Sequence, residues 1–299
     1  MTVSVACFGI AVHDLVFHLV EDPAMGSKNP ASSLTVTSGG PAVNAAKAIV
    51  DLGGEACVVS VVGDDAAGDA VIGDLAFRGV DTRWMDRYVG AATSVSSVML
   101  HPDGERTIVN ATDRAVGHGS HRDTADAAQW ADAVLVDVRW MESALAAVAQ
   151  GAQTAKPVVV DFDISREVPS LDLFDQVSHV VFSLGGLASI APGLSPTDAL
   201  RDIPRSSGTV FGVTMGHRGS MWLVDGNVVE VPAFDTEVVN TLGAGDVFHG
   251  AFALAIGEHR STIESAIWAS AAAALFCSLG LGTETRLSRK VVDDMVASR

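Results

Sequence analysis

The chain has 299 residues, of which 48% are hydrophobic, and its formal net charge is −17 at pH 7. This charge argues against nucleic acids and membranes as partners, because phosphate backbones and anionic lipids repel an acidic protein. Its three cysteines, Cys7, Cys57 and Cys277, lack the spacing of a metal site or a disulfide framework. We therefore expect buried core thiols in a cytoplasmic protein.

Strand-like and helix-like runs alternate along most of the chain. In chain order they are Val3–Gly9, Pro41–Leu52, Ala56–Val62, Ala66–Arg78, Ala133–Asp137, Glu142–Gln150, Val158–Asp161, Val180–Ser183 and Thr209–Thr214. Such alternation predicts an α/β fold with a doubly wound, mainly parallel sheet and helices on both faces. The length fits one large domain over residues 1–299 with a small insertion.

Two segments, at about 15–37 and 94–110, break this alternation with β-branched residues and no helix. The second contains Pro102-Asp103-Gly104, which is typical of a hairpin turn. Because no helix lies between these strands to cover them, we predict that they form a small β-strand lid over the substrate.

The first glycine motif is Ser38-Gly39-Gly40-Pro41, followed by a helix that carries Asn44 in its first turns. The two glycines allow a ligand to approach the backbone closely. Asp14, after the first strand, adds a carboxylate, although an isolated aspartate there is also an ordinary turn residue. Together these residues predict a polar cluster that binds the hydroxyl groups of a ligand.

The second motif is Gly243-Ala244-Gly245-Asp246 at the start of an apolar helix. Its backbone amides and the positive end of the helix dipole form an anion hole. Asp246 beside that hole is suited to accept the proton of an attacking hydroxyl while the amides stabilise a phosphoryl group in transfer. Taken alone, the motif is equally compatible with a turn and a helix cap.

Polar residues follow several predicted strands, and ligands of open parallel sheets bind beyond the carboxyl ends of the strands. The residues at those ends are Arg139, Asp161, Asp163, Ser183 and the loop Thr214-x-Gly216-x-Arg218-Gly219. That loop, too, is compatible with a plain hairpin.

The two glycine motifs, in this order and separation, resemble the two signatures of the PfkB/ribokinase family of sugar kinases. Val62-Gly63-Asp64-Asp65 and Arg78-Gly79-Val80-Asp81 extend the resemblance over nearly the whole chain. It implies ATP and Mg²⁺ as cofactors, a helix over Ile267–Ser278 beside the adenine, and a homodimer formed through the lid.

The resemblance also implies residue roles. Phosphate and nucleotide contacts are expected from Ser183, Thr214, Gly216, Arg218, Gly219, Gly243 and Gly245. Asp161 and Asp163, at the end of a predicted strand, are the best carboxylates for the outer shell of Mg²⁺. Two departures weaken this assignment. Asn240 stands where many members have Asp, which puts potassium activation in doubt, and Ser183-x-x-Gly186 stands where the family has Asn-x-x-Glu.

Lys28 lies in the first predicted lid strand, Asn110 ends the second, and Arg139 follows a strand of the large sheet. Together they suit an anionic group on the sugar, although Lys28 and Arg139 taken alone are also typical of solvated surface charges. The segments Asp137-Val138-Arg139-Trp140 and Gly243–Ala251 resemble the sulfofructose kinases within the family. That resemblance implies transfer from ATP to the C1 hydroxyl of 6-deoxy-6-sulfofructose. A ketohexose 6-phosphate (fructose or tagatose 6-phosphate) is the rival substrate, and a catalytically inactive sugar-binding homologue is a further alternative.

Overall fold

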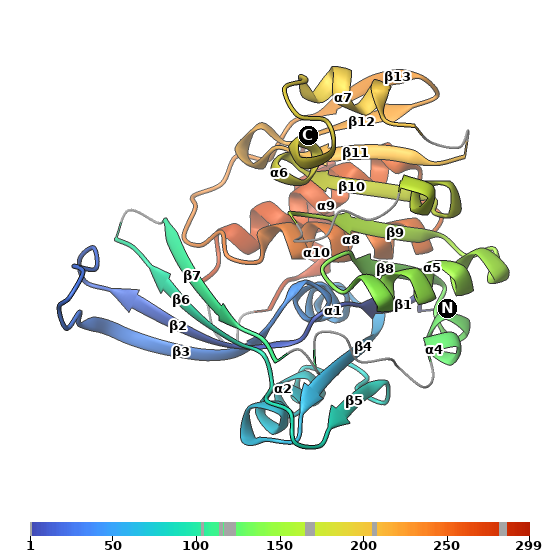
Figure 1. The fold of residues 1–299 in the computed structure, drawn as a ribbon. Coiled ribbons are helices and arrows are strands. Elements are labelled where there is room, and N and C mark those ends of the chain that lie inside the picture. The colour runs from blue at the N-terminus through green and yellow to red at the C-terminus, as the bar shows by residue number, and fades with distance from the viewer. Residues whose placement is uncertain are drawn as a thin grey trace.

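A nine-stranded sheet forms the centre of this computed structural model, in the order β13-β12-β11-β10-β9-β8-β1-β4-β5 (Figure 1). The structure describes residues 2–102, 105–113, 116, 124–164, 171–204, 208–280 and 286–299. The strands are β1 (Ser4–Phe8), β4 (Glu55–Gly63), β5 (Met85–Tyr88), β8 (Ala133–Asp137), β9 (Val158–Phe162), β10 (His179–Ser183), β11 (Val210–Thr214), β12 (Ser220–Val224) and β13 (Asn227–Val231). In this order, every neighbouring pair from β11 across to β5 is parallel, whereas β12 and β13 are antiparallel additions at the other edge.

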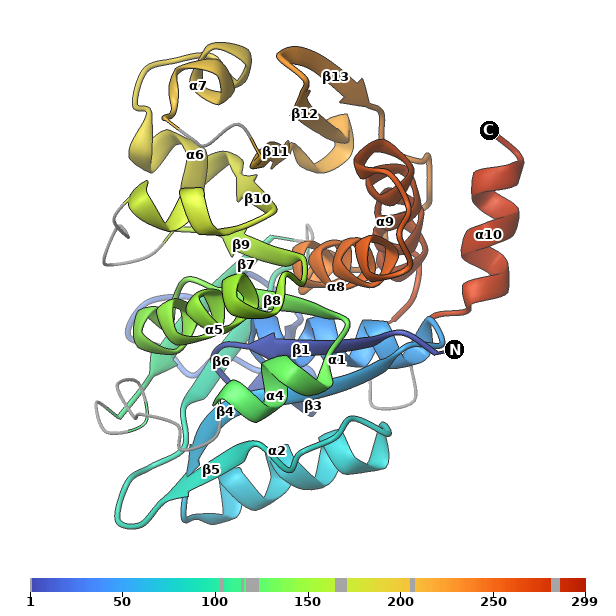
Figure 2. The ribbon, with the colours of Figure 1, turned by 90° about the vertical axis from the view of Figure 1, so that its right-hand side faces the viewer.

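Helices cover both faces of this sheet (Figure 2). One side holds α1 (Pro41–Asp51), α2 (Ala66–Phe77), α8 (Ala244–Gly257), α9 (Thr262–Cys277) and α10 (Arg289–Ala297). The other holds α4 (Thr124–Trp130), α5 (Met141–Thr154), the 3₁₀ turn η1 (Leu171–Gln176), α6 (Leu184–Ile190) and α7 (Pro196–Asp202). A second 3₁₀ turn, η2 (Gly216–Arg218), joins β11 to β12. The predicted doubly wound fold is confirmed.

Because successive side chains of a buried strand point to opposite faces, the sheet has a separate hydrophobic core on each side. In β1, Val5 and Cys7 belong to the core beneath α1 and α8, whereas Ala6 and Phe8 belong to the opposite core. All four are 0–1% exposed, as expected for a parallel strand covered on both faces. In the part of the chain that the structure describes, no helix is both long and apolar enough to cross a membrane.

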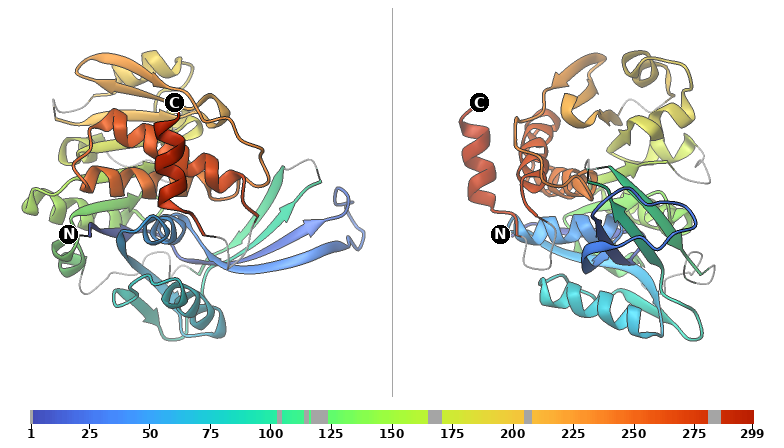
Figure 3. Two further views of the ribbon diagram at one scale, coloured as in Figure 1. Left: turned by 180° about the vertical axis from the view of Figure 1, so that it is seen from behind. Right: turned by 90° about the vertical axis from the view of Figure 1, so that its left-hand side faces the viewer.

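A second, four-stranded sheet projects from one end of this body (Figures 1 and 3). Its order is β3 (Ala31–Gly39), β2 (Val12–Leu19), β6 (Val95–Leu100) and β7 (Arg106–Ala111). The outer pairs are antiparallel, and β2 pairs with β6 in parallel. The predicted hairpin is present as β6 and β7, and its turn residues Asp103 and Gly104 lie outside the described residues.

The register of this small sheet separates its two faces. Asp14 is paired with Ser96, and Ser96 with Asn110, so the three side chains share one face. Because side chains alternate along a strand, Arg106 in β7 lies on that face as well. The opposite face is mainly apolar and carries Leu15, Phe17, Leu34, Val36, Met99 and Val109, with Ser97 and Thr107 among them. Leu34 is 51% and Val109 59% exposed.

Candidate active site

The centre of the site is the start of α8, where the chain turns sharply into the helix. Gly243 caps the helix in the left-handed conformation, with φ of 86°, which only glycine adopts without strain. Asp246 follows in the first helical turn, and its Oδ2 accepts a 2.7 Å hydrogen bond from Nδ2 of Asn44 in α1. The two glycine motifs, far apart in the sequence, therefore meet at this carboxylate.

The surroundings of Asp246 make its carboxylate more basic than a surface one. Burial raises its pKa to about 6, while the hydrogen bond from Asn44 and the positive charge of Arg139 limit the rise. At neutral pH the group is mostly ionised and is still able to take a proton. This is the state that a general base requires.

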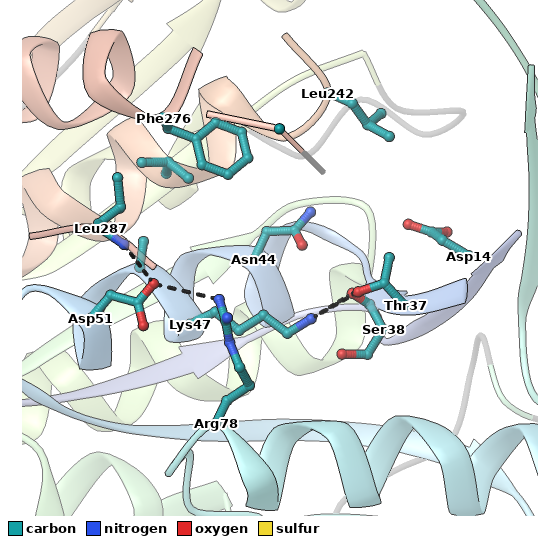
Figure 4. A pocket seen from close by; sticks show the side chains of 13 residues that line it. Asp14, Thr37, Ser38, Asn44, Lys47, Asp51, Arg78, Leu242, Phe276 and Leu287 are labelled. Atoms are coloured by element: carbon teal, nitrogen blue, oxygen red, sulfur yellow. Dashed lines mark hydrogen bonds and ion pairs between the residues drawn. The ribbon is translucent and has the colours of Figure 1, made fainter. Parts of the chain in front are cut away.

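A small cavity of about 70 Å³ lies beside Asn44 and is lined by Asp14, Ser38 and Lys47, among others (Figure 4). Burial raises the pKa of Asp14 to about 6. A Cβ added at Gly39 would lie 1.8 Å from Oδ2 of Asp14, so the glycine is what lets this carboxylate pack against the backbone. The structure thus brings Asp14, Gly39 and Asn44 together, as predicted.

Lys47 is a member of this cavity that sequence reasoning missed. Its Nζ lies 2.8 Å from Oδ2 of Asp74 in α2 and donates a 2.8 Å hydrogen bond to the carbonyl of Ser38. Its side chain is only 10% exposed. The signal available in the sequence was a lysine on the otherwise apolar side of the helix that carries Asn44.

A larger cavity of about 510 Å³ lies between η2, the start of α8 and α9. Thr214, Gly216, Gly219, Ala244 and Gly245 line it, as do the small side chains Ser270, Ala273 and Ala274 of α9. Of the residues predicted to contact nucleotide, Ser183, Arg218 and Gly243 are absent from this lining in the described part of the chain. Ser183 instead caps α6 and donates a 2.6 Å hydrogen bond to Asp163.

Cys277 also lines the larger cavity. The prediction that all three cysteines are buried core residues is therefore wrong for Cys277.

Comparison with known proteins identifies this arrangement. A family model described as pfkB family carbohydrate kinase matches residues 3–286. The chain belongs to the pfkB family. It is therefore a carbohydrate kinase, the ATP-dependent phosphotransferase that the motifs predict.

Three relatives each match nearly the whole length of this chain. A solved structure described as a candidate ribokinase from Agrobacterium tumefaciens is 31% identical, covers 100% of this chain and 98% of its own, and superposes with a TM-score of 0.93. Ribokinase of Bacillus subtilis (strain 168) is 25% identical over 93% of this chain and 94% of its own length. Deoxyribokinase of Salmonella typhi is 24% identical over 94% of each.

Charged residues gather at the carboxyl end of β8 and β9 in this pfkB kinase. Nε of Arg139 donates a 3.0 Å hydrogen bond to Oδ1 of Asp137, and Nη1 lies 4.0 Å from Oδ2 of Asp163. Burial raises the pKa of Asp161 to about 8, and Nδ1 of the buried His249 lies 3.3 Å from its Oδ2. His249 was also missed by sequence reasoning, although a histidine within the apolar run of α8 is a usable signal.

The three residues predicted to hold an anionic group come from separate places. Arg139 lies just beyond the carboxyl end of β8 in the large sheet, and Asn110 lies in β7 on the same face as Asp14. The prediction that Lys28 lies in a strand is wrong. It lies exposed in the connection between β2 and β3, where Gly26 adopts a φ of 76° and Asn29 bonds back to Ala24. This connection lies at the free end of the small sheet (Figure 3), so one subunit does not bring Lys28 to Arg139.

Proposed function

We propose that this kinase transfers the γ-phosphoryl group of ATP to the C1 hydroxyl of 6-deoxy-6-sulfofructose, giving the 1-phosphate and ADP. The observation that supports this chemistry is the hydrogen bond between Asn44 and Asp246. Asp246 lies at the start of α8, and Ala244 and Gly245 of the same turn line the large cavity. Asp246 accepts the hydroxyl proton as the sugar oxygen bonds to phosphorus. The bond from that phosphorus to the bridging oxygen breaks, and ADP leaves.

The two cavities suit the two substrates of this reaction. The larger cavity, about 510 Å³, takes the nucleotide, with the small residues of α9 beside the base and Thr214 and Gly216 beside the phosphates. The sugar lies against Asp14, Gly39, Gly40 and Asn44. The backbone amides at Gly243, Ala244 and Gly245 then face the phosphoryl group as its charge shifts in transfer.

Mg²⁺ supplies charge neutralisation to the triphosphate, mainly through water and phosphate oxygens. Among the described residues, no group of three or more His, Cys, Asp or Glu side chains has metal-binding geometry. The Asp163 side chain is 41% exposed and fits an outer-shell role through water. Asp161 is 4% exposed and has a raised pKa, so it does not fit that role.

The charge of Arg139 supports an anionic sugar. Its positive charge lowers the pKa of Asp246, which supports a position close to a substrate at that carboxylate. Asn110 lies on the sugar-facing side of the small sheet. We infer that Lys28 completes the pocket from a second subunit, because its connection lies at the free end of that sheet.

The apolar face of the small sheet supports such a homodimer. Leu34, Val36 and Val109 are 51%, 44% and 59% exposed in the single chain. Apolar side chains grouped on one face of a sheet are typical of an interface. Pairing of two such faces would carry the connection with Lys28 of each copy toward the other.

The substrate is tested by coupled ADP release with Mg-ATP, comparing 6-deoxy-6-sulfofructose, fructose 6-phosphate and ribose. We expect kcat/KM for sulfofructose to be at least tenfold the others, about 1.4 kcal/mol of discrimination. Arg139→Ala should abolish this preference, and Arg201→Ala, an exposed arginine in α7, should retain it. Preference for fructose 6-phosphate or ribose refutes the sulfosugar assignment, and sugar binding without ADP release indicates an inactive homologue.

A further inference from the structure

Arg106 connects the small sheet to the phosphate end of the nucleotide cavity. It begins β7, on the same face as Asp14 and Asn110. Its Nη1 donates a 2.9 Å hydrogen bond to Oγ1 of Thr241, the residue that opens the loop into α8. Both Arg106 and Thr241 line the cavity of about 510 Å³, together with Ala244 and Gly245 of the anion hole.

The charge balance of this cavity calls for a cation. A triphosphate carries several negative charges, and the chain itself has a formal net charge of −17. Within the described part of the molecule, Arg106 is the only Arg or Lys that lines the cavity. Arg218, the cation expected from the sequence, is exposed on η2 and does not contribute to the lining.

We propose that Arg106 is a phosphate-binding residue of the nucleotide site, delivered by the small sheet. A guanidinium presents a planar fork of donors that matches phosphate oxygens better than an ammonium does. The hydroxyl of Thr241 is a neutral partner for an exposed arginine. We infer that this bond gives way to a charge-assisted one when phosphate is present, because hydrogen bonds between ionised groups are stronger.

The position of Arg106 couples sugar binding to nucleotide binding. The strand pairings that carry Arg106 also carry Asp14, through β6. A sugar that holds the small sheet against the body therefore also holds the guanidinium at the phosphates. This inference rests on the kinase activity of the family and not on the identity of the sugar.

The first test measures nucleotide binding without any sugar. Isothermal titration calorimetry measures the affinity of the protein for Mg-ADP and for the Mg²⁺ complex of the non-hydrolysable analogue AMP-PNP. The wild type is compared with Arg106→Ala, Arg106→Lys and Thr241→Val. Arg201→Ala is the matched control, since it removes the same charge from an exposed site in α7. We expect Arg106→Ala to weaken AMP-PNP binding at least tenfold and Arg106→Lys to restore part of it. Unchanged AMP-PNP binding in Arg106→Ala overturns the proposal.

The second test distinguishes a contact between Arg106 and phosphate from a purely structural role of Arg106 in holding the loop at Thr241. If Arg106 only holds the loop through Thr241, Thr241→Val loses as much affinity as Arg106→Ala, and the double variant loses no more. That result would overturn the proposal. A larger loss in Arg106→Ala, with an unchanged melting temperature and a lower kcat on the best sugar, supports it. Because AMP-PNP binding needs no sugar, failure of the sulfofructose assignment leaves this test intact.

Discussion

Nδ2 of Asn44 donates a 2.7 Å hydrogen bond to Oδ2 of Asp246, across 202 positions of sequence. The donor lies on the helix that follows Gly39-Gly40, and the acceptor lies on the helix that follows the anion-hole loop. The bond orients the carboxylate and favours its ionised form. It therefore ties the first glycine motif to the protonation state of the proposed base, Asp246.

The acid limb of the pH–activity profile tests this coupling. Asp246 has a raised pKa of about 6, so kcat/KM should fall below pH 6 as the base becomes protonated. Asn44→Ala removes a bond to the charged form, so the limb should move up by about one pH unit. The measurement is kcat/KM for the best sugar between pH 5 and 9, with Asn227→Ala on β13 as control. An unmoved limb in Asn44→Ala excludes the coupling.

The same carboxylates should make stability depend on pH. The pKa values of Asp14 and Asp246 rise from 3.8 to about 6 on folding. The folded chain therefore binds extra protons between these values, and stability falls as pH rises through that window. Asp246→Asn and Asp14→Asn should each stabilise the protein by about 1–2 kcal/mol at pH 7.5. Urea unfolding at pH 7.5 and pH 4 should show that the gain is largely lost at pH 4.

The buried pair of Lys47 and Asp74 predicts an asymmetric response to mutation. The two side chains are 10% and 13% exposed, and Asp74 also accepts a hydrogen bond from Ser38. Asp74→Asn leaves a buried ammonium without its counter-charge and should destabilise the fold by about 3 kcal/mol. The double variant Lys47→Met/Asp74→Leu should recover much of that loss in urea unfolding. A double variant that is no more stable than Asp74→Asn contradicts this account.

Gly40 and Gly216 form a matched pair of left-handed glycines. Gly40 has φ of 95°, and an added Cβ would lie 2.3 Å from the carbonyl oxygen of Ile10. Gly216 has φ of 59° with nothing within 4 Å of an added Cβ. Gly40→Ala should cost about 2 kcal/mol or more, and Gly216→Ala about 1 kcal/mol. Thermal unfolding of the two variants measures the difference, and equal losses would show that the contact with Ile10 is unimportant.

The proposed interface on the small sheet predicts a change of assembly. Leu34→Glu and Val109→Glu place charges in the apolar face and should convert a dimer to monomers in analytical ultracentrifugation. Val89→Glu is the control, since Val89 is 88% exposed next to β5 and lies outside that face. A wild type that sediments as a monomer would refute the interface directly.

The sequence predicted the fold because its signals are local. Apolar runs of strand length, such as Val158–Asp161, depend only on nearby residues. The same holds for the glycines that mark the two ends of α1. Asn44 and Asp246 were both predicted as site residues, since each lies at a fixed offset from a glycine motif. Their direct hydrogen bond was not predicted, because it depends on how two distant helices pack.

Residues whose roles come from distant contacts were missed or misplaced. Lys47 and His249 lie in helical runs whose apolar neighbours conceal them, and their partners Asp74 and Asp161 lie on other elements. Arg218 matched a loop pattern, but the side chain that lines the cavity is Arg106, delivered from another sheet. Lys28 was placed in a strand because β-branched alternation surrounds its segment, whereas Pro23, Gly26 and Pro30 enforce a connection.

Gly40 joins the small sheet directly to helix α1. Strand β3 ends at Gly39 and α1 begins at Pro41, so one residue separates the projecting sheet from the helix that holds Asn44. Because one residue links the two elements, we expect a tilt of that sheet to move the first turn of α1. The hydrogen bond from Asn44 to Asp246 therefore begins about one helical turn from the point where the small sheet meets the body.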